Sequence, residues 1–332
     1  TPTDNGYIQA IDYESGESIW QNSLEKKHHI KGNATSNNNF SFFCQSESGT
    51  IYSVSNSSGE IIWSKTGSFQ EHHSIDAEYI YVGTGEGLLC LSQEDGAVLW
   101  MSKVGRIEGQ PIVGINNELF CSTSNRGIVC FNTTSGELKW QTVVGGKNKT
   151  TAVTEDGQVY VVTDAGLLVS LSAENGKILW ERKIDPTVKD KWMPSLTLGD
   201  DGTIFLGSKR GKLFAFQGLS GPPKDAPWPM WQQNRRNSGI AHDGSESQSV
   251  NQPTSLELAN EKGNLNPAPT DILLAANSIE ENEPAGTIVG NLTLVDQESA
   301  GGQLTSNEEV GEKLWEFETG GGVRSSFAIG SD

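Results

Sequence analysis

Two pairs of adjacent histidines are the side chains of this sequence best suited to holding a transition metal. One pair is His28 and His29, and the other is His72 and His73. Four imidazoles within reach of one another would bind Zn²⁺, Ni²⁺ or Cu²⁺. Both pairs stand near the starts of expected strands in consecutive repeats. They either converge near the centre of the fold or lie in separate connecting loops, and we expect separate loops.

Four cysteines, Cys44, Cys90, Cys121 and Cys130, are the other residues with metal or redox chemistry. They include neither a Cys-x-x-Cys motif nor an adjacent pair, which argues against a zinc or redox site. Cys44 and Cys121 occupy matching positions of their repeats, in strands that we expect to be buried. We therefore expect small core side chains. The alternative is a cross-strand disulfide between Cys121 and Cys130, which fall on neighbouring strands.

The elements that must position these side chains are copies of one motif with a period near 40 residues. Trp63, Trp100, Trp140 and Trp180 end four copies and are 37, 40 and 40 residues apart. Each copy has a glycine, an apolar stretch and a polar turn, with a second glycine four residues before the tryptophan. The copies span residues 6–20, 49–63, 87–100, 127–140 and 166–180, and a sixth, 211–221, lacks the usual ending. Such a period built from strands predicts a repeat fold.

One complete repeat, residues 150–180, predicts four short antiparallel strands. Its turns carry the pairs Asp156-Gly157, Ala165-Gly166 and Asn175-Gly176, which favour tight hairpins. Four such strands make one blade of an all-β propeller, and the copies predict about six blades, with seven as the upper count. The tryptophan ends the outer strand, where its ring would pack between blades. Stacking of sugars on these rings is the functional alternative.

The repeated pattern resembles the pyrroloquinoline-quinone-type (PQQ-like) repeat over residues 1–241. The segment WPMWQQNRRNSGIA, residues 228–241, is similar to the end of secreted propellers of this group. The group includes quinoprotein dehydrogenases and non-catalytic propellers such as the outer-membrane assembly lipoprotein. This chain lacks the adjacent cysteine pair that the dehydrogenases carry over their cofactor, and it is too short for their eight blades. The resemblance therefore implies the non-catalytic branch, with no organic cofactor.

Residues 313–332 repeat the pattern after a long interruption. They contain a tryptophan-bearing outer strand, a glycine turn and an inner strand. We expect Lys313–Phe317 to complete the blade of residues 193–221. We also expect Val323–Gly330 to supply an inner strand of the first blade, residues 4–20, so that the C-terminal segment closes the ring. The alternative is that residues 313–332 open a second propeller.

The interruption itself is acidic and has no blade pattern, since residues 243–312 contain 13 Asp or Glu and one Lys. Its first part, residues 242–267, is polar enough to be a linker. The second part, residues 268–312, contains a stretch that resembles the first third of a bacterial cadherin-like repeat, through Pro269–Ile272, Glu281–Gly290 and Asp296–Glu298. The resemblance implies Ca²⁺ ligands at Glu281, Asp296 and Glu298, since Ca²⁺ takes carboxylate oxygens. Without such ligation the segment is a solvated, disordered acidic loop, and this is what we expect by default.

Charge and hydropathy narrow the class of function. The net charge of −18 argues against binding to the phosphates of nucleic acids. No apolar run approaches the ~18 residues of a membrane-spanning helix. We expect a monomeric, non-catalytic scaffold for binding or adhesion, with a protein or a glycan as partner, that is secreted, periplasmic or displayed on the cell surface. The alternative is an enzyme on the same scaffold: a polysaccharide lyase or hydrolase, or a degenerate quinoprotein dehydrogenase.

Overall fold

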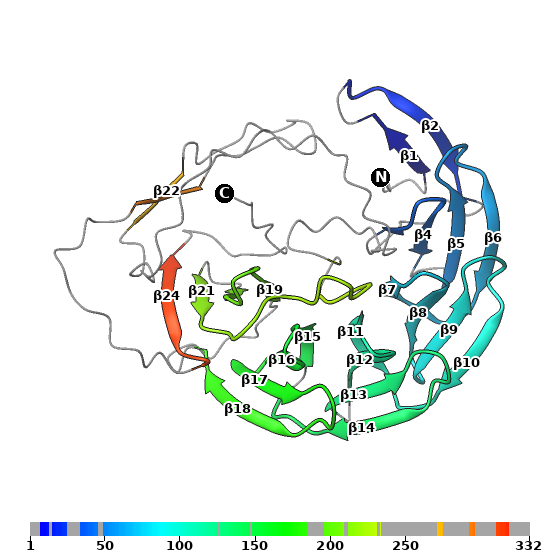
Figure 1. Ribbon diagram of the computed structural model, residues 1–332. Coiled ribbons are helices and arrows are strands. Elements are labelled where there is room, and N and C mark those ends of the chain that lie inside the picture. The colour runs from blue at the N-terminus through cyan, green and yellow to red at the C-terminus, as the bar shows by residue number, and fades with distance from the viewer. Residues whose placement is uncertain are drawn as a thin grey trace.

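The computed structural model describes residues 7–12, 15–24, 34–45, 49–124, 127–146, 148–184, 196–208, 212–230, 233, 271–274, 292–295 and 310–318. Within these ranges every regular element is a β-strand. The sheets of the repeat are antiparallel and stand side by side in an arc around a common centre (Figure 1). The protein is therefore an all-β propeller, as the repeat predicts.

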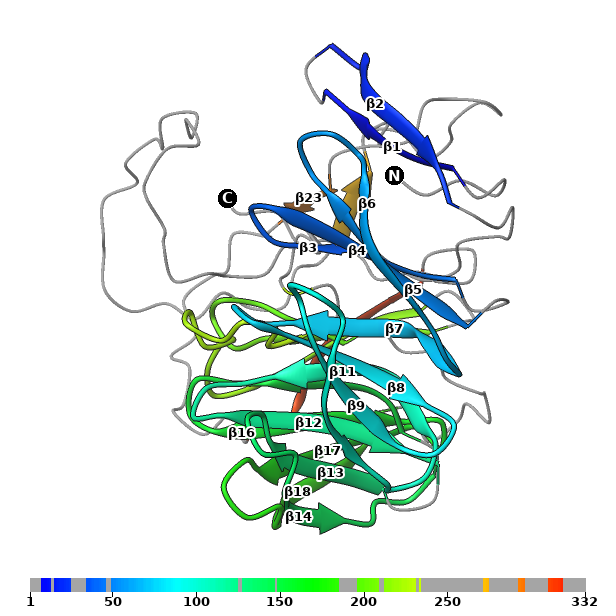
Figure 2. The ribbon, with the colours of Figure 1, turned by 90° about the vertical axis from the view of Figure 1, so that its right-hand side faces the viewer.

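Four consecutive blades have four strands each, in chain order from the centre outwards (Figure 2). Their two middle strands are buried on both faces because neighbouring blades cover them, and the outer strands alternate between covered and exposed residues. The strands are β3 (Thr35–Ser36), β4 (Phe40–Gln45), β5 (Thr50–Ser55) and β6 (Ile61–Thr66); β7 (Phe69–Ile75), β8 (Tyr79–Thr84), β9 (Leu88–Ser92) and β10 (Val98–Ser102); β11 (Ile107–Val113), β12 (Glu118–Thr123), β13 (Gly127–Asn132) and β14 (Leu138–Thr142); β15 (Asn148–Val153), β16 (Gln158–Thr163), β17 (Leu167–Ser172) and β18 (Ile178–Lys183).

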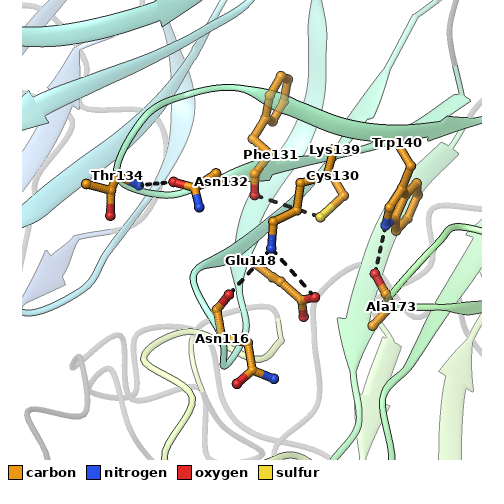
Figure 3. Close-up of polar contacts among 9 residues, drawn as sticks. All are labelled: Asn116, Glu118, Cys130, Phe131, Asn132, Thr134, Lys139, Trp140 and Ala173. Carbon is orange, nitrogen blue, oxygen red and sulfur yellow. Dashed lines mark hydrogen bonds and ion pairs between the residues drawn. The ribbon is translucent and has the colours of Figure 1, made fainter.

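The tryptophans join each blade to the next. In four of the five repeats that end in a tryptophan, the indole Nε1 donates a hydrogen bond to a backbone carbonyl at the outer turn of the following blade. The pairs are Trp20 with Asn56 at 2.7 Å, Trp63 with Gln93 at 2.8 Å, Trp100 with Thr133 at 2.9 Å and Trp140 with Ala173 at 2.7 Å. Figure 3 shows the last of these bonds. The repeated tryptophan is therefore a structural clamp between blades.

The second glycine of each repeat receives the ring of that clamp. A Cβ atom on Gly136 would lie 2.5 Å from the Trp100 ring, and one on Gly96 would lie 2.8 Å from the Trp63 ring. Both glycines also have a positive φ of 68°, which side chains with a Cβ adopt at a cost. These two requirements explain why this position of the repeat is glycine.

The first blade contributes two described strands, β1 (Tyr7–Ile11) and β2 (Ser18–Ser23), paired antiparallel. The inner strand expected from Val323–Gly330 lies outside the described residues. Gly16 occupies the clamp position of this blade, yet a Cβ there would meet nothing within 4 Å. Among the described residues, no tryptophan of another blade reaches the first blade, and the arc is open between it and the last blade (Figure 1).

The last blade takes its outer strand from the far end of the chain. Its sheet consists of β19 (Leu196–Leu198), β20 (Ile204–Gly207), β21 (Lys212–Phe216) and β24 (Lys313–Glu318). β24 pairs antiparallel with β21, which is the blade in which the sequence pattern places Lys313–Phe317. Lys212 Nζ also lies 3.2 Å from Glu316 Oε1 across this pair.

The outer hairpin of the last blade keeps the hydrogen bonds of the other blades. In a regular blade such as the third, Ser92 N donates to Ala97 O and Gly96 N donates back to Ser92 O, at 2.9 and 3.0 Å. In the last blade, Gln217 N donates to Glu312 O and Gly311 N donates to Gln217 O, at 2.8 and 2.7 Å. Residues 218–310 are therefore an insertion at the tip of this hairpin.

The insertion contains one further described pair of strands. β22 (Asp271–Leu274) pairs antiparallel with β23 (Leu292–Val295). Both strands fall within the segment that resembles the start of a cadherin-like repeat. The pair is compatible with that resemblance, which stays a prediction.

Candidate functional site

Residues 219–230 cover one end of the inner strands at the centre of the arc. Trp228 exchanges two backbone hydrogen bonds with Val113 at the end of β11, at 2.8 and 3.1 Å, and Pro229 O accepts from Val153 N at 2.8 Å. The Trp228 side chain has no exposed surface. In Figure 1 this yellow-green segment crosses the centre of the arc. We call residues 219–230 the plug segment and this side of the arc the plugged end.

The starting ends of the inner strands lie on the other side and are irregular. The pairing of β7 with β8 shifts between Phe69 and His73, and that of β11 with β12 shifts between Glu108 and Ile112. Bulges of this kind redirect side chains and are frequent beside functional sites. We call residues 69–73 and 107–112, which contain the two shifts, the bulged end.

Polar side chains gather at the bulged end. Gln110 Nε2 donates a hydrogen bond to His73 O at 2.7 Å, which joins β11 to β7. Gln70 Nε2 and Glu108 Oε2 are shielded from solvent and have no hydrogen-bond partner among the described residues. Leaving a buried polar group unpaired costs about 1–3 kcal/mol. These two atoms are therefore positions where water or a polar group of a bound molecule would be stabilised.

The histidines expected to hold a metal are only partly within the described residues. His73 is 1% exposed and lies opposite Val82 on β8, and His72 next to it is half-buried. His28 and His29 lie outside the described residues. No group of three or more His, Cys, Asp or Glu in the described part of the chain is placed to hold a metal ion. The four-imidazole site stays a prediction.

The calcium ligands implied by the cadherin-like resemblance are Glu281, Asp296 and Glu298. All three lie outside the described residues, although β23 ends directly before Asp296. Calcium binding there stays a prediction.

The cysteines are core residues, as the sequence predicts. All four are buried. Cys121 lies opposite Val129 and Cys130 lies opposite Phe120, so the two thiols are offset along the strands and the alternative disulfide is not formed. Burial raises the pKa of the Cys90 and Cys130 thiols to about 12, which keeps both in the unreactive protonated form.

The bulged end is the part of the candidate site that the sequence pattern does not predict. A usable signal was present, because FQEHHSI and IEGQPIV interrupt otherwise apolar inner strands with Gln, Glu and His. The clamp tryptophans, by contrast, are identified from their spacing alone. In the described part of the chain, no helix has the length and apolar character needed to cross a membrane.

Similarity to known proteins covers most of the propeller. The sequence profile of a family described as "outer membrane protein assembly factor BamB" matches residues 4–90, 48–116 and 85–241. The outer membrane protein assembly factor BamB of Yersinia pestis is 24% identical over 257 residues, which is 69% of this chain. The match spans 62% of the length of that relative.

Solved structures show the same fold. BamB from Moraxella catarrhalis superimposes with a TM-score of 0.54 and 20% identity, over 68% of this chain and 73% of that one. The computationally designed protein Ika8 superimposes with a TM-score of 0.55 and 11% identity, over 64% of this chain and 66% of that one. Because the family profile covers residues 4–241, this chain belongs to the PQQ-like propeller family of the outer membrane protein assembly factor BamB.

Proposed function

We propose that this protein is a non-catalytic scaffold that binds a protein partner in the periplasm or at the cell surface. The observation that carries the proposal is the match of residues 4–241 to a family of outer membrane protein assembly factors. A name of that kind implies protein partners and a place at the cell envelope. The blade repeats supply a rigid frame, and the loops at the two ends of the arc supply the surfaces that differ between such frames.

A protein partner is favoured over a glycan because the repeated tryptophans pack between blades. Glycan-binding surfaces commonly present flat aromatic rings. Here the rings of Trp100 and Trp140 pack against Tyr81 and Phe120 at centroid distances of 6.1 and 5.9 Å. Their indole nitrogens are also bonded to the next blade. These rings pack inside the fold and therefore cannot stack on a sugar.

The bulged end is the side of the arc at which we expect the partner to bind. The plug segment covers the other side of the centre, where its backbone is already hydrogen-bonded to β11 and β15. Among the described residues, Gln70 Nε2 and Glu108 Oε2 at the bulged end are buried without a hydrogen-bond partner, whereas the one such atom of the plug segment, Trp228 Nε1, belongs to a side chain with no exposed surface. The connection from β14 to β15, where Val143 is 69% exposed, lies on the same side of the arc as the bulged end.

Site-specific photocrosslinking tests the proposal and its direction. A benzophenone amino acid replaces Val143 near the bulged end or, as a matched control, Leu219 at the plugged end, which is 58% exposed. We expect one saturable adduct at position 143 with an envelope protein, competed by excess unmodified chain, and none at 219. An adduct at 219 alone would contradict the binding end. Absence of any protein adduct, together with binding on a glycan array, would contradict the protein partner.

A further inference from the structure

The last blade holds its outer strand without the short turn that holds the others. In the regular blades three residues, such as 56–58, separate the two hydrogen-bonded positions of the outer hairpin. In the last blade the insertion of residues 218–310 lies between them. The pairing is nevertheless complete, because β24 faces β21 from Lys212 opposite Glu318 to Phe216 opposite Lys313.

The position of β24 repeats the regular geometry in three separate respects. The two hairpin hydrogen bonds are present. The register shift between Ala215 and Phe216 recurs at the same place as those between Ser53 and Val54 and between Ser170 and Leu171. Gly311 has a φ of 85°, and a Cβ on it would lie 2.9 Å from the Trp180 ring of the preceding blade.

The contacts between β24 and its acceptor therefore determine where the strand docks, because no short turn holds it in place. The acceptor consists of the free edge of β21 and the Trp180 ring. The strand supplies Gly311 for the ring and Glu316 for Lys212, at 3.2 Å. An identical strand from another molecule would form identical contacts, which is the condition for exchange of an element between copies.

We propose that the edge of β21 is a strand-acceptor site for residues 310–318, and that two copies of this chain exchange β24 to form a strand-swapped dimer. The contacts are the same in both forms, so the balance depends on concentration. The connection through residues 218–310 gives an effective concentration of at most about millimolar, because this value falls as a connection lengthens. The monomer should predominate well below that concentration, and exchange should begin as it is approached. The regular blades are excluded from exchange by their three-residue turns.

Strand replacement in the full-length chain tests the proposal. A protease site is placed between residues 243 and 308, the purified protein is cleaved, and a fluorescent peptide covering residues 309–320 is added. We expect the cleaved C-terminal fragment to stay bound through size-exclusion chromatography and the peptide to replace it in a saturable manner. A peptide with Gly311→Val should compete at least about tenfold less well, because its side chain meets the Trp180 ring.

A second measurement keeps the proposal falsifiable if cleavage disturbs the fold. Two uncleaved versions with different affinity tags are mixed at micromolar concentration and at the highest soluble concentration, then diluted and tested for co-purification. Mixed dimers that form only at high concentration support exchange, and a Gly311→Val chain should not form them. The proposal is overturned if the peptide fails to enter a cleaved protein that keeps its native circular dichroism. It is also overturned if no mixed dimers form at any concentration.

Discussion

The junction in front of the last blade has the packing of the four earlier junctions but lacks their hydrogen bond. Trp140 Nε1 donates to Ala173 O, the first carbonyl after the hairpin position of the next blade. The equivalent carbonyl in the last blade is Gly218 O, which accepts from Gln217 Nε2 at 2.8 Å. Trp180 Nε1 is buried and has no partner among the described residues. Gly311 still lies against the Trp180 ring.

This difference separates two roles of the repeat. Ring packing requires only a glycine with a positive φ at the start of the outer strand, and β24 supplies it from across the insertion. The hydrogen bond requires a local turn that presents a carbonyl, and the insertion removes that turn. The clamp therefore has two separable parts. The outer strand supplies the ring packing, and the turn before it supplies the hydrogen-bond acceptor.

The largest effect is expected from filling the space under a clamp ring. Gly136→Ala places a Cβ 2.5 Å from the Trp100 ring at a φ of 68°. Backbone strain and overpacking together should lower the free energy of unfolding by about 2–5 kcal/mol. Gly16→Ala is the matched control, because its φ is 72° but nothing lies within 4 Å. Only strain remains there, about 1–2 kcal/mol. Urea unfolding measures both, and equal losses would show that the ring contact is unimportant.

A smaller difference is expected between two tryptophan substitutions. Trp140→Phe and Trp180→Phe remove the same ring atoms, but only the first also leaves a buried carbonyl, that of Ala173, without its donor. Trp140→Phe should therefore cost more, by about 1–3 kcal/mol. Thermal and urea unfolding of both variants measure the difference. A cost at Trp180 as large as that at Trp140 would contradict the unequal junctions.

The smallest effect is expected in the pH dependence of β24 docking in the last blade. The hydrogen bond from Lys313, with Lys212 nearby, lowers the pKa of Glu316 below its ordinary value. The stability that this carboxylate contributes is present above the ordinary value and is lost as pH falls through the lowered one. For so exposed a group the loss should be only tenths of a kcal/mol. Glu316→Gln should remove this part of the acid dependence of peptide replacement and weaken replacement at neutral pH by the same tenths of a kcal/mol. An unaltered acid dependence would show that the ion pair is irrelevant.

Much of the fold could be predicted because the repeat encodes it locally. The strands of residues 150–180 follow directly from the turn pairs and from the alternation of apolar and polar residues. The repeated spacing of glycine and tryptophan, as in Gly136 and Trp140, marks the residues that form the clamp. The place of Lys313 in the last blade could also be predicted, because a tryptophan-bearing strand is followed there by a glycine turn and the 193–221 blade lacks a regular fourth strand. The missing hydrogen bond of Trp180 was not, since it depends on which way one carbonyl points after an insertion.

The candidate site was less predictable for a physical reason. The bulges at Phe69 and Glu108 arise from how two strands pair in three dimensions, and a single sequence carries no register. The sequence did show polar residues in inner strands, but it singled out His72 and His73 for metal chemistry. In the structure His73 is a buried strand residue whose carbonyl oxygen accepts from Gln110.

Amide hydrogen exchange followed by mass spectrometry tests the central claim most directly. That claim is that β24, residues 313–318, is a full fourth strand of the last blade, docked as tightly as β14 and β18 are in theirs. Peptides covering β24 should exchange as slowly as those covering β14 and β18, and the Gly311→Val chain should lose this protection only in β24 and in the β21 amides that pair with it. Exchange of the β24 amides at the rate of an unstructured chain in the unmodified protein would contradict the claim.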